Sequence, residues 1–202
     1  MNSIDKLTEL FKSLPGIGPR QARRFVYYIL SRNGSYSDDL VRAIEELKRG
    51  IHQCDKCQRY FVKNGSPANT CKICLDETRD NSLLMVVPRD VDLEVVEKSG
   101  SYEGHYFVLG GVVPILDKEP ERRIRLQLLA SRLEEGAKAG LKEVILAMNV
   151  NMDGEHTADF IKGYFKDLPV TFSLLGRGLS NGAELEYADP ETLKNALRNR
   201  TK

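Results

Sequence analysis

The chain has 202 residues, of which 41% are hydrophobic and 29% are charged, enough for one sizeable core or two small ones. This composition excludes a disordered tail, and the lack of any run of about 18 apolar residues excludes a membrane-spanning helix. The N-terminus has no basic and then apolar signal pattern, so we expect a cytoplasmic protein.

Residues 1–50 contain three apolar stripes at helical spacing, separated by two short breaks. The first break is residues 15–19, which read Pro-Gly-Ile-Gly-Pro, and the second is Asn33-Gly34. Pro19 suits the first turn of the helix that follows, because proline lacks an N–H that would go unpaired there. We therefore predict a helical domain over residues 1–52.

The first break has the features of a phosphate-binding turn. Its two glycines permit a tight turn and leave backbone N–H groups uncovered at a helix N-terminus, where a phosphate is favoured. Three arginines follow, and residues 1–36 have six basic and two acidic side chains. The pattern predicts contact with the DNA backbone that is indifferent to base sequence, and the alternative is a plain turn with a solvated basic face. The predicted DNA-binding residues are Gly16, Gly18, Arg20, Arg23 and Arg24.

Two adjacent tyrosines follow on the same predicted helix. Tyr27 and Tyr28 could stack on bases, as aromatic side chains do in proteins that bind single strands. Neighbouring positions on a helix point in different directions, so we expect at least one of the two to lie in the core.

All four cysteines lie within residues 51–77, as two Cys-x-x-Cys pairs that are 13 residues apart. Four thiolates suit tetrahedral zinc and leave no position for water, so we predict one structural Zn²⁺ per chain. The segment over residues 53–78 has too little core to fold alone, and metal binding would contribute its stability. The predicted ligands are Cys54, Cys57, Cys71 and Cys74.

Two disulfides or a redox dithiol are the alternatives to zinc. Disulfides are disfavoured in the cytoplasm, and a redox Cys-x-x-Cys needs no second pair. His52 lies beside the site, and we expect it to be a surface or supporting residue because the fourth ligand is already supplied.

From about residue 80, short apolar runs alternate with helical patterns. Strands that alternate with helices predict a parallel sheet covered on both faces, over a domain at residues 79–176. The longest helical pattern lies around residues 121–138, and we expect residues 122–125 to be a solvated face of that helix. The predicted strands are residues 83–87, 106–109, 144–148 and 170–174.

The final segment, residues 177–202, is predicted to be a loop that leads into a short helix near residues 190–199. Asp189 stands immediately before this helix and is the expected N-cap.

Phosphodiester chemistry in the α/β domain would need clustered carboxylates at strand ends to hold magnesium. The third predicted strand is followed by Asn149 and Asn151, so the tight carboxylate pair is missing there. Asp153 and Glu155 remain, but Glu155 suits a helix N-terminus. Asp90 and Asp92 are also expected at a helix start. His105 and His156 lack the partners of a catalytic or metal site, and we predict no catalytic residue.

The order of these parts closely resembles the bacterial RecR family of recombination mediators. The most specific segments are the hairpin and residues 178–189, which read GLSNGAELEYAD; residues 88–91, 108–111 and 177–179 match as well. The resemblance covers nearly all of the chain. The chain departs from the family pattern at Val86-Val87, where the family has an acid before the proline.

The resemblance implies an α+β protein of several parts. These are a helix-hairpin-helix N-terminal domain, a four-cysteine zinc finger, an α/β Toprim-like domain with a parallel-rich sheet, and a C-terminal oligomerisation segment. In the family, Arg20 and Arg24 correspond to DNA-contacting positions and the four cysteines to zinc ligands.

The resemblance also implies a function. RecR-like proteins are not enzymes but ring-shaped homotetramers that act as DNA clamps in the cytoplasm, at the nucleoid. With RecO, and in some bacteria RecF, they help to load RecA onto gapped or single-stranded DNA that is coated by SSB. The two alternatives are a magnesium-dependent nuclease or topoisomerase-like Toprim enzyme, and a zinc-stabilised interaction module that does not touch DNA.

Overall fold

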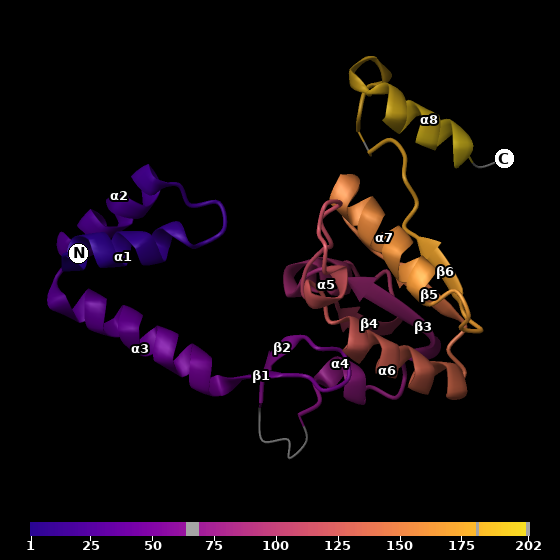
Figure 1. Cartoon of the computed structure of the whole chain (residues 1–202), viewed down its shortest axis with the longest axis horizontal. Helices are drawn as coiled ribbons and strands as arrows, with labels where there is room; N and C mark the ends of the chain where they lie inside the picture. Colours follow the sequence, from indigo (N-terminus) through magenta and orange to yellow (C-terminus); the bar gives the residue numbers. More distant parts are fainter. Residues whose placement is uncertain (64–68, 181, 201–202) are drawn as a thin grey trace. The chain divides into compact units, whose positions relative to one another are not determined.

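The computed structural model describes residues 1–63, 69–180 and 182–200. The chain divides into two compact units, Met1–Ile51 and His52–Lys202 (Figure 1). Among the described residues, every helix is too short or too polar to cross a membrane.

The first unit consists of three helices, α1 (Ser3–Lys12), α2 (Pro19–Leu30) and α3 (Gly34–Gly50). Asparagine side chains cap α1 and α3, and Pro19 occupies the first turn of α2 as predicted. Phe11 and Phe25 join α1 to α2 in an edge-to-face contact with ring centroids 5.8 Å apart.

The first unit has very little core of its own. In its described residues, Ala22 and Val26 of α2 are the buried side chains, and α3 buries none. The expectation that Tyr27 or Tyr28 would lie in the core is wrong, since they are 54% and 46% exposed. The reason is that the three helices enclose very little interior, with Ala22 and Val26 as the buried side chains of the described residues, and a tyrosine ring has no core to enter.

The second unit contains a four-stranded sheet in the order β4-β3-β5-β6. All three neighbouring pairs are parallel, as the alternation of strands and helices predicted. Val86 pairs with Phe107 of one neighbouring strand and with Leu146 of the other, so β3 is an interior strand of the sheet. The strands are β3 (Asp80–Val87), β4 (Gly104–Val108), β5 (Glu143–Leu146) and β6 (Thr171–Leu174).

Each face of this sheet has its own apolar cluster, because successive side chains of a strand point to opposite faces. Leu84 and Val86 pack with residues of α6 (Leu126–Lys138) and α7 (Met152–Tyr164). Met85 and Val87 pack with α5 (Asp90–Ser99) and with the cysteines. Right-handed crossovers explain this division, since the chain moves from β3 to β4 in one direction and from β5 to β6 in the other.

The cysteine segment comprises β1 (Ile51–Gln53), β2 (Tyr60–Val62) and the one-turn α4 (Lys72–Leu75). The two strands pair with each other. The cysteines share their apolar cluster with Met85, Val87, Tyr106 and Val108, so they form part of the cover of the sheet.

Residues 122–125 differ from the prediction of a solvated helix face. A 3₁₀ turn, η1 (Pro120–Arg122), precedes α6, and α6 begins only at Leu126. Ile124 is 6% exposed, and Arg125 is partly buried and donates hydrogen bonds to backbone carbonyls of other segments. These tertiary contacts outweigh the helical propensity of the four residues.

The C-terminal segment contains a 3₁₀ turn, η2 (Leu185–Tyr187), and the helix α8 (Pro190–Arg198). The Asp189 side chain caps α8 as predicted, and it accepts hydrogen bonds from the N–H groups of Glu191 and Thr192 at 3.0 and 2.9 Å. No described residue of η2 or α8 is buried.

Candidate functional site

The turn between α1 and α2 is built around two glycines. Gly16 has a φ of 76°, which glycine adopts without strain, and the Ile17 N–H donates to the Leu14 carbonyl at 3.1 Å. Gly18 is the N-cap of α2 and offers no side chain to the N–H groups of the first turn. In the described structure, a Cβ at Gly18 would meet nothing within 4 Å, so this glycine leaves the helix N-terminus open.

The three predicted arginines lie exposed on the first two turns of α2, beside these glycines. Arg23 Nη2 is 3.8 Å from Asp5 Oδ1 of α1, which partly offsets its charge. Within the described ranges, Arg20 and Arg24 make no ion pair, so their charges are available to a ligand. The structure therefore distinguishes Arg20 and Arg24 from Arg23, and these are the same two residues that the family resemblance singled out.

This arrangement suits an anion that approaches along the axis of α2. The open N–H groups and the positive end of the helix dipole favour a phosphate, and the two free guanidinium groups add charge. None of these groups is arranged to read the edge of a base, so the expected contact is with a nucleic-acid backbone.

The four cysteines of the second unit come together in a buried cluster. Their sulfur atoms all lie within 4.8 Å of one another, and the Sγ atoms of Cys57 and Cys71 are 3.6 Å apart. A tetrahedral zinc with Zn–S bonds of about 2.3 Å places its sulfurs about 3.8 Å apart, so the cluster fits such an ion. All four are free cysteines, which is the form that a metal site requires.

Hydrogen bonds among the thiols shift their pKa values in opposite directions. The hydrogen bond from Cys57 lowers the pKa of Cys54, because it stabilises the Cys54 thiolate. The same bond, together with burial, raises the pKa of Cys57. The Cys71 backbone N–H also donates to Cys54 Sγ at 3.3 Å, as expected for a sulfur that carries negative charge.

The cysteine segment is joined to the sheet by hydrogen bonds that sequence reasoning missed. The Val108 N–H at the end of β4 donates to the Cys57 carbonyl at 2.8 Å. Arg125 Nη1 donates to the carbonyls of Gln58 and Val108 at 3.0 and 2.9 Å. Gln58 has a φ of 63°, a backbone conformation that residues other than glycine rarely adopt. Arg125 therefore holds the carbonyl of a residue in an unusual conformation.

One signal could have indicated this approach of Arg125. Two glycines, Gly110 and Gly111, closely follow β4, and glycine after a strand often marks a close approach of another segment. A Cβ at Gly110 would lie 3.2 Å from Arg125 Nε, which is tighter than an ordinary contact.

The acids near the carboxyl ends of the strands are engaged in structural contacts. Asp90 accepts a hydrogen bond from the Tyr60 N–H at 2.7 Å, and Asp153 accepts from the Ile115 N–H at 3.4 Å. Glu155 accepts from Arg177 Nη1 at 2.6 Å. Asp90 and Asp92 lie in the first turn of α5, and Glu155 in the first turn of α7, as expected.

Among the described residues, these acids do not belong to a group of three or more potential ligands that could share an ion. In the described part of the chain, the cysteine cluster is the one group of three or more potential ligands close enough to share an ion. His105, which directly precedes the predicted strand at residues 106–109, is the second residue of β4, and its Nε2 is 3.0 Å from Asn81 Oδ1.

Comparison with known proteins decides the family. Residues 4–48 match the RecR helix-hairpin-helix family, residues 82–175 the Toprim domain, and residues 178–201 the RecR C-terminal family. Recombination protein RecR of Chlorobium chlorochromatii is 35% identical over 98% of this chain and 96% of its own length. The chain belongs to the RecR family. Recombination protein RecR of Treponema denticola is 36% identical over the whole of both chains, and that of Cereibacter sphaeroides is 38% identical over 98% of this chain and 95% of its own.

The RecR matches include the segments that carry the sequence resemblance. The helix-hairpin-helix match contains the open turn and its arginines, and the C-terminal match contains the capped helix α8. The Toprim match contains all four parallel strands apart from the first residues of β3. The expected fold of a hairpin domain, a four-cysteine cluster and a Toprim-like sheet is therefore confirmed.

Proposed function

We propose that this RecR family protein is a DNA-binding clamp of recombinational repair that has no catalytic activity of its own. The observation that carries the proposal is the open N-terminus of α2, where Gly18 leaves the first turn uncovered beside the unpaired Arg20 and Arg24 of the described structure. Backbone contacts of this kind bind DNA without regard to sequence, which suits a protein that acts wherever a gap occurs.

The proposed absence of catalysis is supported by the structural hydrogen bonds and ion pairs that the acids of the Toprim domain make. Magnesium-assisted phosphodiester chemistry needs carboxylates that are free to converge on one ion. Glu155 is instead paired with Arg177, and Asp90 and Asp153 accept hydrogen bonds from backbone N–H groups. At the end of β3 the chain has Val86 and Val87, both fully buried, in place of an acid.

The four-cysteine cluster supports one structural Zn²⁺. Cys54, Cys57, Cys71 and Cys74 would be the ligands, and the ion would keep the cysteine segment folded against β3 and β4. With four thiolates bound, the ion has no open position, so it takes no part in a reaction.

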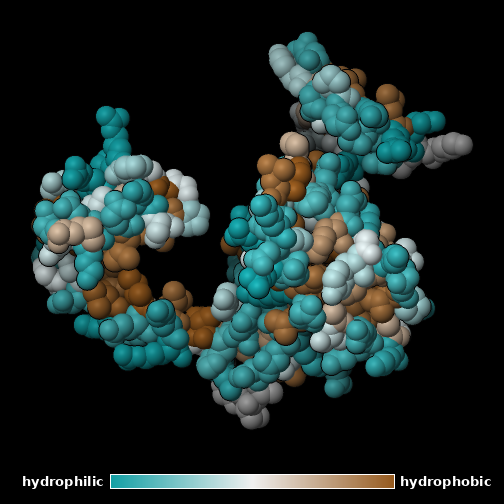
Figure 2. Space-filling model, in the orientation of Figure 1, coloured by the Kyte–Doolittle hydropathy of each residue, from teal (hydrophilic) through white to brown (hydrophobic). Residues whose placement is uncertain are grey.

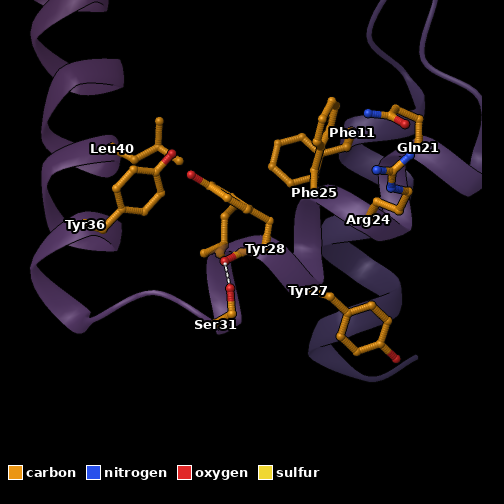
Figure 3. Close-up of a pocket in the computed structure, with 10 residues that line it drawn as sticks. Phe11, Gln21, Arg24, Phe25, Tyr27, Tyr28, Ser31, Tyr36 and Leu40 are labelled. Atoms are coloured by element: carbon orange, nitrogen blue, oxygen red, sulfur yellow. Dashed lines mark hydrogen bonds between the residues drawn. The ribbon is translucent and has the colours of Figure 1, made fainter.

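Self-association into a ring, which we propose to be a homotetramer, is supported by apolar side chains that the first unit leaves exposed (Figure 2). We call Tyr36, Leu40, Ile44 and Leu47 the α3 stripe, because they lie on one face of α3 at helical spacing. Part of this stripe lines a groove of about 710 Å³ together with Phe25 and Tyr28 (Figure 3). A second copy of the chain would cover this groove and complete the core.

The C-terminal segment supplies a second candidate contact between copies. Leu185, Tyr187 and Leu197 are 65%, 80% and 65% exposed, which is unusual for large apolar side chains in one short segment. A ring closed through two kinds of contact would hold DNA by its topology, and several weak hairpin contacts would act together.

The proposed cellular role is the loading of RecA onto gapped or single-stranded DNA that SSB covers. RecO, and in some bacteria RecF, would be the protein partners, in the cytoplasm at the nucleoid. The proposed parts are residues 1–52 for DNA contact and assembly, 53–78 for zinc, 79–176 for the Toprim domain and 177–202 for assembly.

The deciding experiment compares the wild type with Arg20→Glu/Arg24→Glu on gapped DNA at low salt with magnesium. We expect the wild type to retard the DNA without cleavage and the double variant to lose at least about tenfold in affinity, because two phosphate contacts become repulsive. Lys98→Glu/Lys138→Glu is the matched control, since it makes the same change of charge on exposed helix positions of the second unit.

Each outcome has a distinct meaning. Cleaved product that persists after repurification would contradict the absence of catalysis. Equal binding by the wild type and the Arg20/Arg24 variant would contradict the hairpin contact and favour an interaction module. Equal loss in both double variants would mean that the overall charge, and not the hairpin, determines binding.

A further inference from the structure

Tyr27 is an exposed aromatic residue on the arginine face of α2. The core face of this helix carries Ala22 and Val26, whereas Arg20, Arg24 and Tyr27 follow one another at intervals of four and three residues. Figure 3 shows Tyr28 pointing toward Tyr36, while Tyr27 points away from both. Both tyrosines line the groove of about 710 Å³, but Tyr27 also lines a second groove, between α1 and α2, that Tyr28 does not reach.

Tyr28 already has partners within the first unit. The guanidinium carbon of Arg32 lies 4.4 Å from the centroid of the Tyr28 ring, and the Tyr36 ring meets it edge to face at 6.0 Å. In the described structure, Tyr27 has no aromatic, cationic or hydrogen-bonding partner of this kind. More than half of its side chain is open to a ligand.

The surface beside Tyr27 is a groove of about 810 Å³ between α1 and α2. Arg20, Arg23 and Arg24 line it from α2, together with Tyr27. Arg24 and Tyr27 also lie at the edge of the groove of about 710 Å³. The carboxylates that line it are Asp5 and Glu9 of α1. Asp5 faces Arg23 at 3.8 Å, and Glu9 accepts from Lys12 at 2.8 Å, so both acids already have a cation. Two guanidinium groups, unpaired in the described structure, and an aromatic ring remain for a ligand.

We infer that Tyr27 stacks on an unpaired DNA base whose neighbouring phosphates are held at the hairpin. Tyr27 lies seven positions after Arg20 on α2, which is about 10 Å along the helix axis. That distance is short enough for neighbouring nucleotides of one strand to contact the N-terminus of α2 and the tyrosine ring together. This inference rests on the proposed DNA contact and adds to it a preference for unpaired nucleotides.

The chemistry of the groove favours a nucleotide over a second copy of the chain. An apolar protein surface placed here would bury two guanidinium groups without carboxylate partners, which is costly. A single strand offers phosphates to Arg20 and Arg24 and the flat face of a base to the ring, and every base has such a face. In a duplex the faces are covered by neighbouring bases, so Tyr27 would have nothing to stack on.

The test measures affinity for a single strand and for a duplex of the same length, with the wild type, Tyr27→Leu and Tyr27→Phe. We expect Tyr27→Leu to weaken single-strand binding about tenfold, because it removes the aromatic ring and keeps an apolar side chain. Duplex binding should change less than about twofold, and Tyr27→Phe should match the wild type on both DNAs.

A base analogue, 2-aminopurine, reports the stacking directly. Placed at successive positions of the single strand, its fluorescence should be quenched at one or two positions by the wild type and by Tyr27→Phe, and not by Tyr27→Leu. Equal loss on single strand and duplex, or no loss on either, would overturn the inference.

Two further comparisons separate this inference from its rivals. If Arg20→Glu/Arg24→Glu abolishes binding to both DNAs while Tyr27→Leu changes neither, the hairpin contact stands and only the stacking is wrong. If Arg20→Glu/Arg24→Glu has no effect, the DNA contact itself is wrong. A lower mass of Tyr27→Leu in analytical ultracentrifugation would assign Tyr27 to a contact between copies and so overturn the inference.

Discussion

At the scale of single residues, the N-terminus of α2 is open because its N-cap, Gly18, has no side chain to bond the N–H groups of the first turn. The N-cap of a helix is usually Ser, Thr, Asp or Asn, whose side chain accepts from the first turn, as Asn2, Asn33 and Asp189 do elsewhere in this chain. At Gly18 the space for a side chain is free and the backbone is extended, with φ −80° and ψ 167°. Steric constraint therefore does not explain this glycine, and we propose that it leaves the N–H groups accessible to a ligand.

Gly18→Asp tests this explanation. The carboxylate should cap α2 and raise the free energy of unfolding by a few tenths of a kcal/mol. DNA affinity should fall by about tenfold, because the carboxylate takes the N–H groups and repels the phosphate. Unfolding by denaturant and binding by fluorescence anisotropy measure the two effects.

Asn33→Asp is the matched control, since it adds a carboxylate at the N-cap of the neighbouring helix α3. It should leave DNA affinity within about twofold of the wild type, because screening weakens a distant exposed charge. If Gly18→Asp lost stability along with binding, the glycine would be a structural requirement and this explanation would be wrong.

At the scale of elements, the cysteine segment and the sheet are one folding unit joined by a few specific contacts. The Arg125 side chain donates hydrogen bonds to the carbonyls of Gln58, after the first cysteine pair, and Val108, at the end of β4. The Val108 N–H in turn donates to the Cys57 carbonyl. The cysteines then bury the face of β3 that carries Met85 and Val87. Loss of order in either part would therefore weaken the other.

Arg125→Met should lower the free energy of unfolding by about 2 kcal/mol, since it removes two charge-assisted hydrogen bonds and, in the described structure, leaves the Gln58 carbonyl with only the hydrogen bond from Gln53 Nε2. It should also speed the transfer of zinc to a colorimetric chelator, because the backbone around Cys57 and Gln58 loses its support. Thermal unfolding and the kinetics of zinc release measure these effects.

Arg122→Met is the control, because Arg122 lies exposed three residues earlier and, among the described residues, pairs only with Glu119. Its removal should cost less than about 1 kcal/mol, as for other surface ion pairs. If the two variants unfolded alike and released zinc at the same rate, Arg125 would not connect the cysteine segment to the sheet.

At the scale of the whole molecule, the two units differ in how much core they possess. The second unit buries one apolar cluster on each face of its sheet. The first buries two side chains in its described residues and exposes Tyr36, Ile44 and Leu47 of the α3 stripe, with Leu40 half-buried, so its apolar surface needs a cover from outside. This imbalance is expected of a chain that completes its fold by association.

Leu47→Asp tests the role of the α3 stripe in association. Leu47 is 61% exposed, so the change should not destabilise the single chain by more than about 0.5 kcal/mol, as for other surface substitutions. In a contact between copies the carboxylate would be buried without a partner, and the oligomer should dissociate. Light scattering after size-exclusion chromatography measures the mass.

Arg42→Asp introduces the same residue on the polar side of α3 and should leave the mass unchanged. If Leu47→Asp had the mass of the wild type across the concentration range, the α3 stripe would not be an interface. A smaller mass should also weaken DNA binding, because fewer hairpins would act together.

The sequence by itself determined the features that depend on near neighbours. Cysteine spacing predicted that the four cysteines lie together, residues 15–19 predicted the turn between helices, and apolar runs predicted the four strands. Each of these follows from chemistry or periodicity within a few residues. Two predictions were wrong: the helix begins at Leu126 and not near residue 121, and neither Tyr27 nor Tyr28 is buried. In both cases tertiary contacts, which the local sequence does not reveal, determine the outcome.

Only the tertiary structure decided which residues meet across the fold. The Arg125 contacts join residues 67 and 17 positions apart, and the Arg177–Glu155 pair joins residues 22 positions apart. It also decided that the cysteines cover one face of the sheet while α6 and α7 cover the other. A periodic pattern shows that a side chain will be buried or paired, but the partner is set by how the strands and helices pack.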